Sequence, residues 1–331
     1  MATVGTQRGG RGRRRTAAAL LAALLAAGPL AGCTGSGGST DDGRGSSRPS
    51  PSASRPDGAD GPPVLAVKLD NARAARPHTG VDAADVVYVE QVEGGLSRLM
   101  AVYATRLPES VGPVRSARES DLELLRQFDR PVLAFSGAQG KLLPLIDRAP
   151  LKAVTPVSSS GVYARGADRP APHNLFLRPR RLMGDPPGQA ALTTGFRFGR
   201  PPAGGGPEDA VTVRYPAARF TFTWSEADGR WLVSMDGTPA TTSDGDRLAP
   251  ATVVVQYVTV RPSDYRDFLG NNTPYTETAG SGQATVLRGG RAYEAGWSRP
   301  SAEEGTSFTT EDGERMNFAR GQVWVVYANA A

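Results

Sequence analysis

The sequence predicts an α+β fold, with a mixed α/β N-terminal domain followed by a mainly antiparallel β C-terminal domain. From residue 63 onward, short β-branched and aromatic runs bounded by turn residues predict strands. A capping-box pattern predicts a helix in the first half of the chain. The second half carries strand patterns alone, separated by tight Gly-containing turns. The sequence has no internal repeat of the kind that indicates a solenoid or propeller.

The first 32 residues have the pattern of a signal peptide. Five arginines at 8–15 precede an apolar run at 17–27, which is shorter than the roughly 20 residues of a membrane-spanning helix. Leu30-Ala31-Gly32-Cys33 resembles the bacterial lipobox, whose cysteine is acylated and becomes the new N-terminus. We predict a lipoprotein tethered through lipid on Cys33 to the outer face of a bacterial cytoplasmic membrane, with lipoprotein-processing enzymes as transient partners. The alternative is an ordinary cleavage site beside an incidental cysteine.

Charge and cysteine content bear on three questions: binding to nucleic acid, disulfide formation and the export route. The chain has 38 Lys plus Arg and 33 Asp plus Glu, and all five surplus arginines lie in the signal peptide, so residues 33–331 balance at 33 against 33. Because residues 33–331 carry no net charge, no nucleic-acid partner is predicted. Cys33 is the only cysteine, which excludes a disulfide within the chain. Arg14-Arg15 leaves the export route, general secretory or twin-arginine, open.

Composition divides the exported part into a tether and two domains. Residues 33–62 are rich in Gly, Ser and Pro and contain no large apolar side chain, so they cannot bury enough surface to offset chain entropy, and a disordered tether is expected. An N-terminal α+β domain is predicted over 63–200 and a β-rich domain over 210–331. The stretch 201–209, with consecutive prolines and glycines, is expected to be a linker.

The expected elements can be placed by residue range. Strands are predicted over 64–69, 84–91, 97–105, 131–135, 211–215, 220–224, 231–235, 252–260, 284–287, 316–318 and 323–327. One helix is predicted to begin with Ser116 as N-cap and Glu119 at the N3 position, and a short second helix over 140–148. Glu93-Gly94-Gly95 predicts a hairpin turn between the second and third strands.

The first predicted helix begins beside arginines and a serine. A helix N-terminus presents unpaired backbone amides at the positive end of the helix dipole, and arginine binds oxyanions in bidentate fashion. We therefore predict a face that binds a phosphate, carboxylate or sulfate. Its candidate ligand-binding residues are Arg98, Arg115, Ser116, Arg118, Asn71 and Arg76. The alternative is that Ser116 only caps its helix while the neighbouring arginines face water or pair with Glu119 and Asp121.

Three carboxylates and one histidine are candidate catalytic residues: Asp70, Glu90, Glu93 and His173. On a regular strand Glu90 and Glu93 point to opposite faces, unless the turn at Gly94 rotates the second. Asp70 with the following asparagine suits either a divalent cation or the start of a turn. His173 is either a general base or a structural loop histidine.

Arg98 is expected to pair with one of these carboxylates. No metal site and no cofactor are predicted, because two histidines and one cysteine are too few for a His-rich or Cys-based zinc site. The chain also has no nucleophile elbow, no phosphate-binding loop and no nucleotide fingerprint.

Several blocks resemble the YerB-like bacterial lipoprotein family. They are Lys68-Leu69-Asp70-Asn71, the run from Ala84 to Tyr88, Glu93-Gly94-Gly95, the run from Gly112 to Arg118, Pro172-His173-Asn174-Leu175, Gly296-Trp297 and Gly321-Gln322-Val323-Trp324. The resemblance covers about residues 63–328 and implies an envelope lipoprotein that joins two domains of unknown function, without an established activity. His78 departs from the family pattern, where a glutamine is expected, and so does Ser298-Arg299.

Three hypotheses for function follow. The first, which we prefer, is a non-catalytic envelope module that binds an anionic cell-wall component or a partner protein. The second is a hydrolase or transferase that acts on a phosphorylated or glycan cell-wall polymer, since carboxylates and arginines concentrate in one domain. The third is a structural envelope protein in which the same residues form an internal ion-pair network.

Overall fold

The computed structural model describes residues 62–267 and 269–330. The predicted signal peptide, Cys33 and all but the last residue of the predicted tether lie outside the described residues. Within them, no helix is long and apolar enough to cross a membrane.

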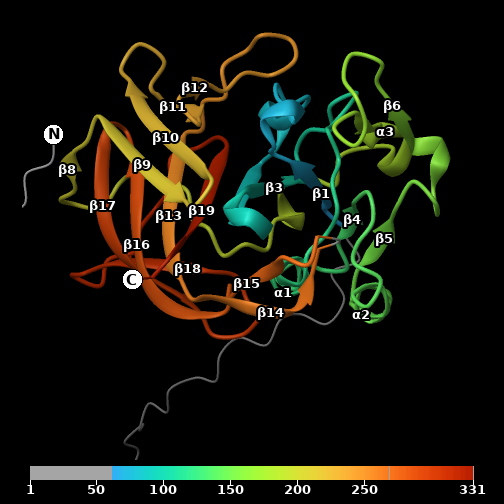
Figure 1. Ribbon diagram of the computed structural model, residues 1–331. Helices are drawn as coiled ribbons and strands as arrows, with labels where there is room; N and C mark the ends of the chain where they lie inside the picture. Colours follow the sequence, from blue (N-terminus) through green and yellow to red (C-terminus); the bar gives the residue numbers. More distant parts are fainter. Residues whose placement is uncertain (1–61, 268, 331) are drawn as a thin grey trace, which may run out of the picture. The chain divides into compact units, whose positions relative to one another are not determined.

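The described residues are mostly β, and one large sheet runs through both halves of the chain (Figure 1). Its strand order is β18-β17-β16-β13-β19-β2-β3-β1-β4-β5, and β8 pairs with β17 off this path. The strands from the N-terminal half are β1 (Leu65–Asp70), β2 (Val86–Gln91), β3 (Ser97–Tyr103), β4 (Val132–Ala134) and β5 (Lys152–Val154). Those from the C-terminal half are β8 (Gly206–Pro207), β13 (Thr252–Val258), β16 (Gly280–Arg288), β17 (Arg291–Arg299), β18 (Ser307–Thr310) and β19 (Val323–Asn329).

Three smaller sheets and short helices complete the described part of the chain. The four-stranded sheet consists of β9 (Ala210–Tyr215), β10 (Ala218–Ser225), β11 (Arg230–Met235) and β12 (Thr238–Pro239). The two-stranded sheets are β14 (Val260–Arg266) with β15 (Asn272–Thr276), and β6 (Tyr163–Arg165) with β7 (Leu175–Leu177). The helices are α1 (Glu119–Leu125), α2 (Leu143–Arg148) and α3 (Pro179–Met183), with 3₁₀ turns η1 (Arg73–Ala75), η2 (Val81–Ala83), η3 (Glu93–Gly95), η4 (Ser160–Val162) and η5 (Gln189–Ala191).

The sequence prediction of an α+β fold needs correction toward β. The three α-helices are each seven residues or shorter, and strands predominate. The C-terminal half is mainly antiparallel, as predicted, and β19 is an exception that runs parallel to both β13 and β2. The strand predicted over 316–318 is wrong: Phe318 forms only an isolated bridge with Phe198. Strands β14, β15, β17 and β18 were not predicted, because polar residues and glycines interrupt their apolar patterns.

The seam between the two halves is the parallel pair β2–β19, in which Val86 lies opposite Val323 and Val89 opposite Val326. Both strands are buried on both faces, which favours the continuous valine-rich runs seen in them. Residues of both predicted domains therefore share one sheet, and the division at 201–209 stays a prediction from sequence. Within that stretch, Gly206 and Pro207 pair with β17.

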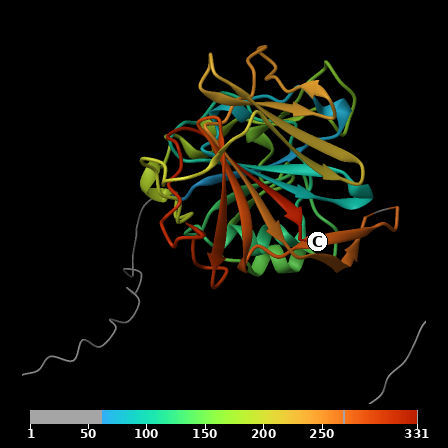
Figure 2. The same cartoon turned by 90° about the vertical axis from the view of Figure 1, so that its left-hand side faces the viewer.

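Strand alternation sorts the core onto the two faces of the large sheet. On one face, Leu65, Val87 and Trp324 pack against the four-stranded sheet. On the other, Ala66, Tyr88 and Met100 pack with the side chains of α1 and α2. Figure 2 shows the four-stranded sheet and the green helices on opposite sides of the large sheet.

The β14–β15 hairpin carries the C-terminal half over α1. The hydroxyl of Ser120 in α1 accepts the Thr276 backbone N–H at 3.0 Å, and the Tyr275 hydroxyl donates to Glu123 at 2.8 Å. Figure 1 shows β14 and β15 beside α1. The hairpin thereby becomes one wall of the region in which the charged residues lie.

Candidate functional site

Antiparallel pairing gathers charged side chains at one end of the sheet. Asp70 of β1 and Glu90 of β2 lie opposite Arg98 of β3 from its two sides, so the three side chains share a face. Lys68 lies two residues before Asp70 and shares that face as well. The turn after β2, the segment before α1, and the loop at residue 173 add further charges. We name the following residues the charge cluster: Lys68, Asp70, Glu90, Glu93, Arg98, Arg115, Arg118, Asp121 and His173.

Lys68 is the most deeply buried cation of the cluster, with no accessible surface. Its Nζ donates to Oδ1 of Asp121 in α1 at 2.7 Å and also contacts Oε1 of Glu90. Burial penalises the ammonium and lowers the Lys68 pKa to about 8, against the opposing attraction of Asp121. Lys68 and Asp121 were not among the predicted site residues. The position of Lys68 within the apolar run of β1 is the signal in the sequence that could have identified it.

Asp70 lies at the end of β1 and connects three segments. Its Oδ1 accepts the Ala72 backbone N–H at 3.1 Å, which begins a turn, and its Oδ2 lies 3.3 Å from Nε of Arg115. The same Oδ2 lies 2.8 Å from Nδ1 of His173. The structure therefore brings together two of the four predicted catalytic residues, Asp70 and His173, through a direct contact.

Glu93 faces the cluster because the backbone turns at Gly94, whose φ is +67°. Its carboxylate accepts Arg118 Nη2 at 2.8 Å and the Thr273 hydroxyl of β15 at 2.6 Å. Arg118 Nε lies 2.6 Å from Glu93 Oε1 at an angle that forms no hydrogen bond. Burial raises the Glu93 pKa, but the bonds from Arg118 and Thr273 outweigh burial and hold the pKa below its usual value. Thr273, from the C-terminal half, was not predicted.

Arg98 corrects an expectation from the sequence, because no carboxylate among the described residues lies within ion-pair distance of it. It is 8% exposed, and Nη1 donates to the backbone carbonyl of Ser116 at 2.8 Å. Arg118 Nη1 points to the same oxygen at 3.5 Å. Burial, followed by the charge of Arg118, lowers the Arg98 pKa to about 9. Two guanidinium groups thus share one neutral acceptor.

The predicted start of the first helix is also wrong. Helix α1 begins at Glu119 with Arg118 as N-cap, and Asp121 takes the N3 role by accepting the Arg118 N–H at 2.7 Å. The Ala117 N–H donates to Gly137, and the Arg115 N–H donates to the Lys68 carbonyl. These amides are therefore engaged, and a seven-residue helix provides little dipole. Anion binding at this place must rest on the arginine side chains.

Asn71 and Arg76 form a separate group that is turned toward the four-stranded sheet. The Asn71 Oδ1 accepts Arg76 Nε at 3.0 Å, and Arg76 Nη1 lies 2.9 Å from Oδ2 of Asp236. The nearby His78 is fully buried, and its Nε2 lies 2.8 Å from the Asp70 carbonyl oxygen. Asn71 and Arg76 therefore lie outside the charge cluster and connect it to the second sheet.

His78 is expected to make the protein sensitive to acid. Burial lowers its pKa from 6.5 to about 4, so between these pH values the unfolded chain binds a proton that the folded chain does not. The stability from neutral His78 is present above pH 6.5 and is lost as the pH falls to 4, by about 3 kcal/mol in total. Replacement His78→Gln retains a donor toward Asp70 and is expected to remove this loss in urea unfolding measured from pH 7 to 4.

The matched control for that experiment is His173→Gln, at the chain's other histidine. This variant retains His78 and is expected to retain its loss of stability in acid. Equal slopes of unfolding free energy against pH in the wild type and His78→Gln would contradict the assignment.

A cavity of about 380 Å³ opens beside the cluster. The N-terminal half contributes Glu93, Ser116 and Arg118, and the β14–β15 hairpin contributes Tyr265, Arg266 and Thr273; the remaining lining residues are Ala117, Glu119, Ala138, Gln139, Gly140, Leu142 and Asp267. The Ser116 hydroxyl lies 3.4 Å from that of Ser136, which leaves it able to donate to a ligand. The cavity is thus a shared one, built by both halves of the chain.

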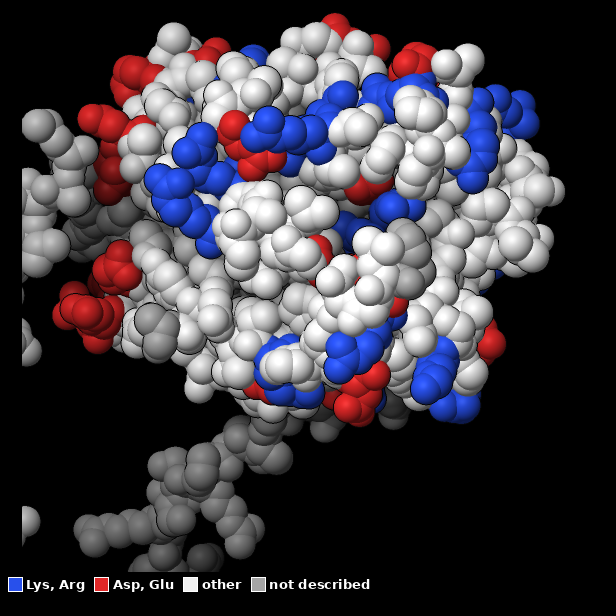
Figure 3. Space-filling view, viewed as in Figure 1, with Lys and Arg blue, Asp and Glu red and all other residues white. Residues whose placement is uncertain are grey.

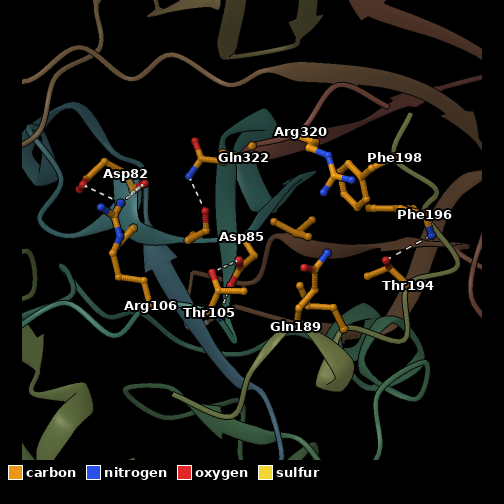
Figure 4. A pocket seen from close by; sticks show the side chains of 15 residues that line it. Asp82, Asp85, Thr105, Arg106, Gln189, Thr194, Phe196, Phe198, Arg320 and Gln322 are labelled. Carbon is orange, nitrogen blue, oxygen red and sulfur yellow. Dashed lines mark hydrogen bonds and ion pairs between the residues drawn. The ribbon is translucent and has the colours of Figure 1, made fainter. Parts of the chain in front are cut away.

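A larger cavity, of about 600 Å³, lies between η2, η5 and the segment before β19 (Figure 4). Its central carboxylate, Asp85, accepts the backbone N–H groups of Ala104 and Thr105 at 2.7 and 2.9 Å. Gln322 donates to two backbone carbonyls of the η2 segment. Figure 4 shows Arg106 beside Asp82 on one side of this cavity. Asp85 and Gln322 are thus already bonded to the backbone around this cavity. We therefore place the candidate site at the charge cluster.

Within the described part of the chain, no group of three His, Cys, Asp or Glu side chains is arranged to hold a metal ion. The charge cluster instead pairs each carboxylate with a cation. Its chemistry is that of charge-assisted hydrogen bonding, in which an arginine with free donors can accept a further anion.

The fold and the site define a β-rich protein whose two halves share one sheet and jointly enclose a charged cluster. The chain belongs to the family described as "Protein of unknown function (DUF3048)": the N-terminal domain of that family matches residues 51–191 and its C-terminal domain matches residues 211–325. This result confirms the YerB-like resemblance predicted from sequence.

Two comparisons describe the relatives. The chain is 43% identical over 65 residues to "Putative lipoprotein YerB" of Bacillus subtilis (strain 168), a match that spans 20% of each protein. It is also similar in fold to the crystal structure of YerB protein from Bacillus subtilis, with a TM-score of 0.67 at 20% identity, over 82% of this chain and 92% of that one. At this identity, the structural likeness shows the fold alone.

Proposed function

We propose that this protein is an envelope-anchored binding protein whose arginine site receives the phosphate or carboxylate group of a cell-wall component or partner protein. Arg118 and the Ser116 hydroxyl line the cavity shared by both halves of the chain. Arg98 and Arg115 complete the site as neighbours of Arg118 in the charge cluster.

The observation that carries the proposal is the incomplete pairing of Arg98. A guanidinium has five N–H donors, and a nearly buried one is normally matched by a carboxylate. Arg98 donates instead to the Ser116 carbonyl oxygen, toward which Arg118 also points. Burial is the main cause that lowers the pKa of Arg98. The charges of Arg118 and Arg115 lower it further, and those of Glu93 and Asp70 raise it only in part, so an added anion would favour the charged guanidinium.

The charge distribution on the protein surface favours a local anion site over long-range electrostatic attraction of anions. Figure 3 shows Lys and Arg side chains interspersed with Asp and Glu on the visible face. A mixed surface of this kind gives little electrostatic steering, so selectivity for an anion must come from the arginines beside the cavity.

Binding fits the cluster better than catalysis does. Glu90 is held by Lys68, and Glu93 is held by Arg118 and Thr273. A carboxylate held by a cation binds a proton less readily, which makes it a poor general base toward an external substrate. In this proposal the ion pairs of Lys68 serve the fold, while Arg98 and Arg118 bind the ligand.

Replacement of Arg98 with glutamine is expected to weaken binding of inorganic phosphate at least tenfold, since a charge-assisted hydrogen bond contributes about 1.5–3 kcal/mol. Isothermal titration calorimetry of the purified mature chain in detergent measures this change. The matched control is Arg130→Gln, at an arginine whose side chain is 71% exposed and which pairs only loosely with Asp129. Equal affinities for the Arg98 and Arg130 variants, or no phosphate binding by the wild type, would reject the proposal.

We place this module at the outer face of the cytoplasmic membrane, through lipid on Cys33. The pattern that precedes Cys33 and the description of the curated relative as a lipoprotein support this location. Cells given labelled palmitate are expected to label the wild-type chain and leave a Cys33→Ser variant unlabelled and free of the membrane fraction. Labelling of the serine variant would show that the anchor is elsewhere.

A further inference from the structure

Three side chains inside the charge cluster form an enclosed group that anion binding does not use. Lys68 of β1 has no accessible surface, Asp121 of α1 has none, and Glu90 of β2 is 4% exposed. The Lys68 Nζ contacts Glu90 Oε1 and lies 2.7 Å from Asp121 Oδ1. Strand β3 lies between β1 and β2, so Lys68 reaches across one strand to meet Glu90.

The same arrangement meets the chemical requirements for amide formation between side chains. The amine must lose its proton to act as a nucleophile, and burial, which lowers the pKa of Lys68 to about 8, favours its neutral form. The acid must be protonated to be attacked, and the burial of Glu90, which is 4% exposed, penalises a charged group. Water must be excluded, because it competes for the carbonyl carbon, and the enclosed site excludes it.

We propose that the folded chain joins Lys68 to Glu90 through an isopeptide bond, with Asp121 as the group that moves the protons. The Lys68 ammonium first gives a proton to Glu90. The neutral Nζ then attacks the Glu90 Cδ, and a C–N bond forms. Asp121 takes a proton from the nitrogen and passes it to the departing hydroxyl, so one C–O bond breaks and one water leaves. An ammonium and a carboxylate become one amide and one water, without an oxidant or a co-reactant.

The assignment of the two acids rests on how each is held. Both oxygens of Asp121 are engaged, Oδ1 by Lys68 and Oδ2 by the Arg118 backbone N–H at 2.7 Å, so this carboxylate keeps its place through the reaction. The Glu90 carboxylate is held by Lys68, whose Nζ contacts Glu90 Oε1. Glu90 is therefore the amide partner, and Asp121, whose Oδ1 keeps its contact with Nζ, transfers the protons.

The bond would cross-link β1 to β2 across the strand between them. A cross-link stabilises chiefly by restricting the unfolded chain. This chain has one cysteine and so cannot form a disulfide within itself. The amide would provide a covalent restraint that does not depend on redox conditions, directly beneath the arginine site. The inference is independent of whether that site binds an anion.

The test is mass spectrometry of the full mature chain, denatured and digested with trypsin. An unlinked Lys68 is cleaved, whereas a linked one is not, so the peptide that ends at Lys68 is expected to be absent. The linked peptides, 45–73 and 74–98, are contiguous, and their product has the mass of the uncleaved segment 45–98. Fragmentation spectra are therefore required to locate the branch between Lys68 and Glu90.

Two variants complete the test. Asp121→Asn removes the proton-transfer group and is expected to yield the free peptide that ends at Lys68. Lys141→Met, at an exposed lysine, is expected to retain the branched product. Release of the unlinked Lys68 peptide in full yield from the wild type would overturn the proposal, even where a variant fails to fold. A branch to Asp121 would overturn the assignment of Glu90, and an unchanged branch in Asp121→Asn would overturn the role of Asp121.

Discussion

Replacement of Lys68 with alanine is expected to lower the free energy of unfolding by about 3–5 kcal/mol, the usual cost of leaving buried charges without their partner. Glu90 and Asp121 would both be left, in a buried region, without the Lys68 amine group that contacts them. Urea unfolding at neutral pH, followed by circular dichroism, measures this change. The loss of a cross-link at Lys68 would add to the effect.

The control for this prediction is Lys141→Ala, at an exposed lysine, which is expected to change stability by less than about 0.5 kcal/mol. A Lys68→Ala variant as stable as the control would show that the two carboxylates are hydrated or protonated without cost, and that the buried ion pairs do not hold the fold.

The second large effect is expected for Trp324→Ala, at about 3–5 kcal/mol, because a buried tryptophan leaves a cavity that the surroundings fill only in part. Trp324 of β19 has no accessible surface and packs against Phe220 and Phe222, with ring centroids 6.4 and 6.0 Å away. These two rings belong to β10, so the substitution weakens the contact between the large sheet and the four-stranded sheet. Thermal unfolding by calorimetry measures the loss.

The conservative variant Trp324→Phe retains most of the aromatic surface but loses the hydrogen bond from Nε1 to Gln322 at 2.8 Å. It is expected to lose less stability than the alanine variant. Equal losses for the two would attribute the effect to the hydrogen bond, and no loss for either would show that the sheets are held together elsewhere.

Strong local patterns in the sequence predicted many of the strands. The runs at 64–69, 84–91 and 323–327 correspond closely to β1, β2 and β19, because buried strands require continuous β-branched and apolar residues whatever their partners. Strands such as β17 escaped prediction. Only one of its faces is buried, through residues such as Tyr293 and Trp297, and the other carries small or polar residues such as Glu294 and Gly296.

The candidate site was predicted by region and by residue type, but not by partner. The sequence identified Arg98, Arg118 and Glu93 as neighbours of one charged region. It could not show that Arg118 forms an ion pair with Glu93 or that Arg98 donates to a backbone carbonyl. These contacts depend on distances of a few ångströms between segments far apart in the chain.

Composition and contiguous blocks of residues were enough to predict the family, the charge balance of residues 33–331 and the residue types of the charged region. The three-dimensional contacts were needed to show that β2 and β19 join the two halves in one sheet and that β15 supplies Thr273 to the site. They also showed that Lys68 is enclosed with Glu90 and Asp121. Burial and pairing arise from contacts between distant segments, and these contacts depend on strand order, which has no local signal in the sequence.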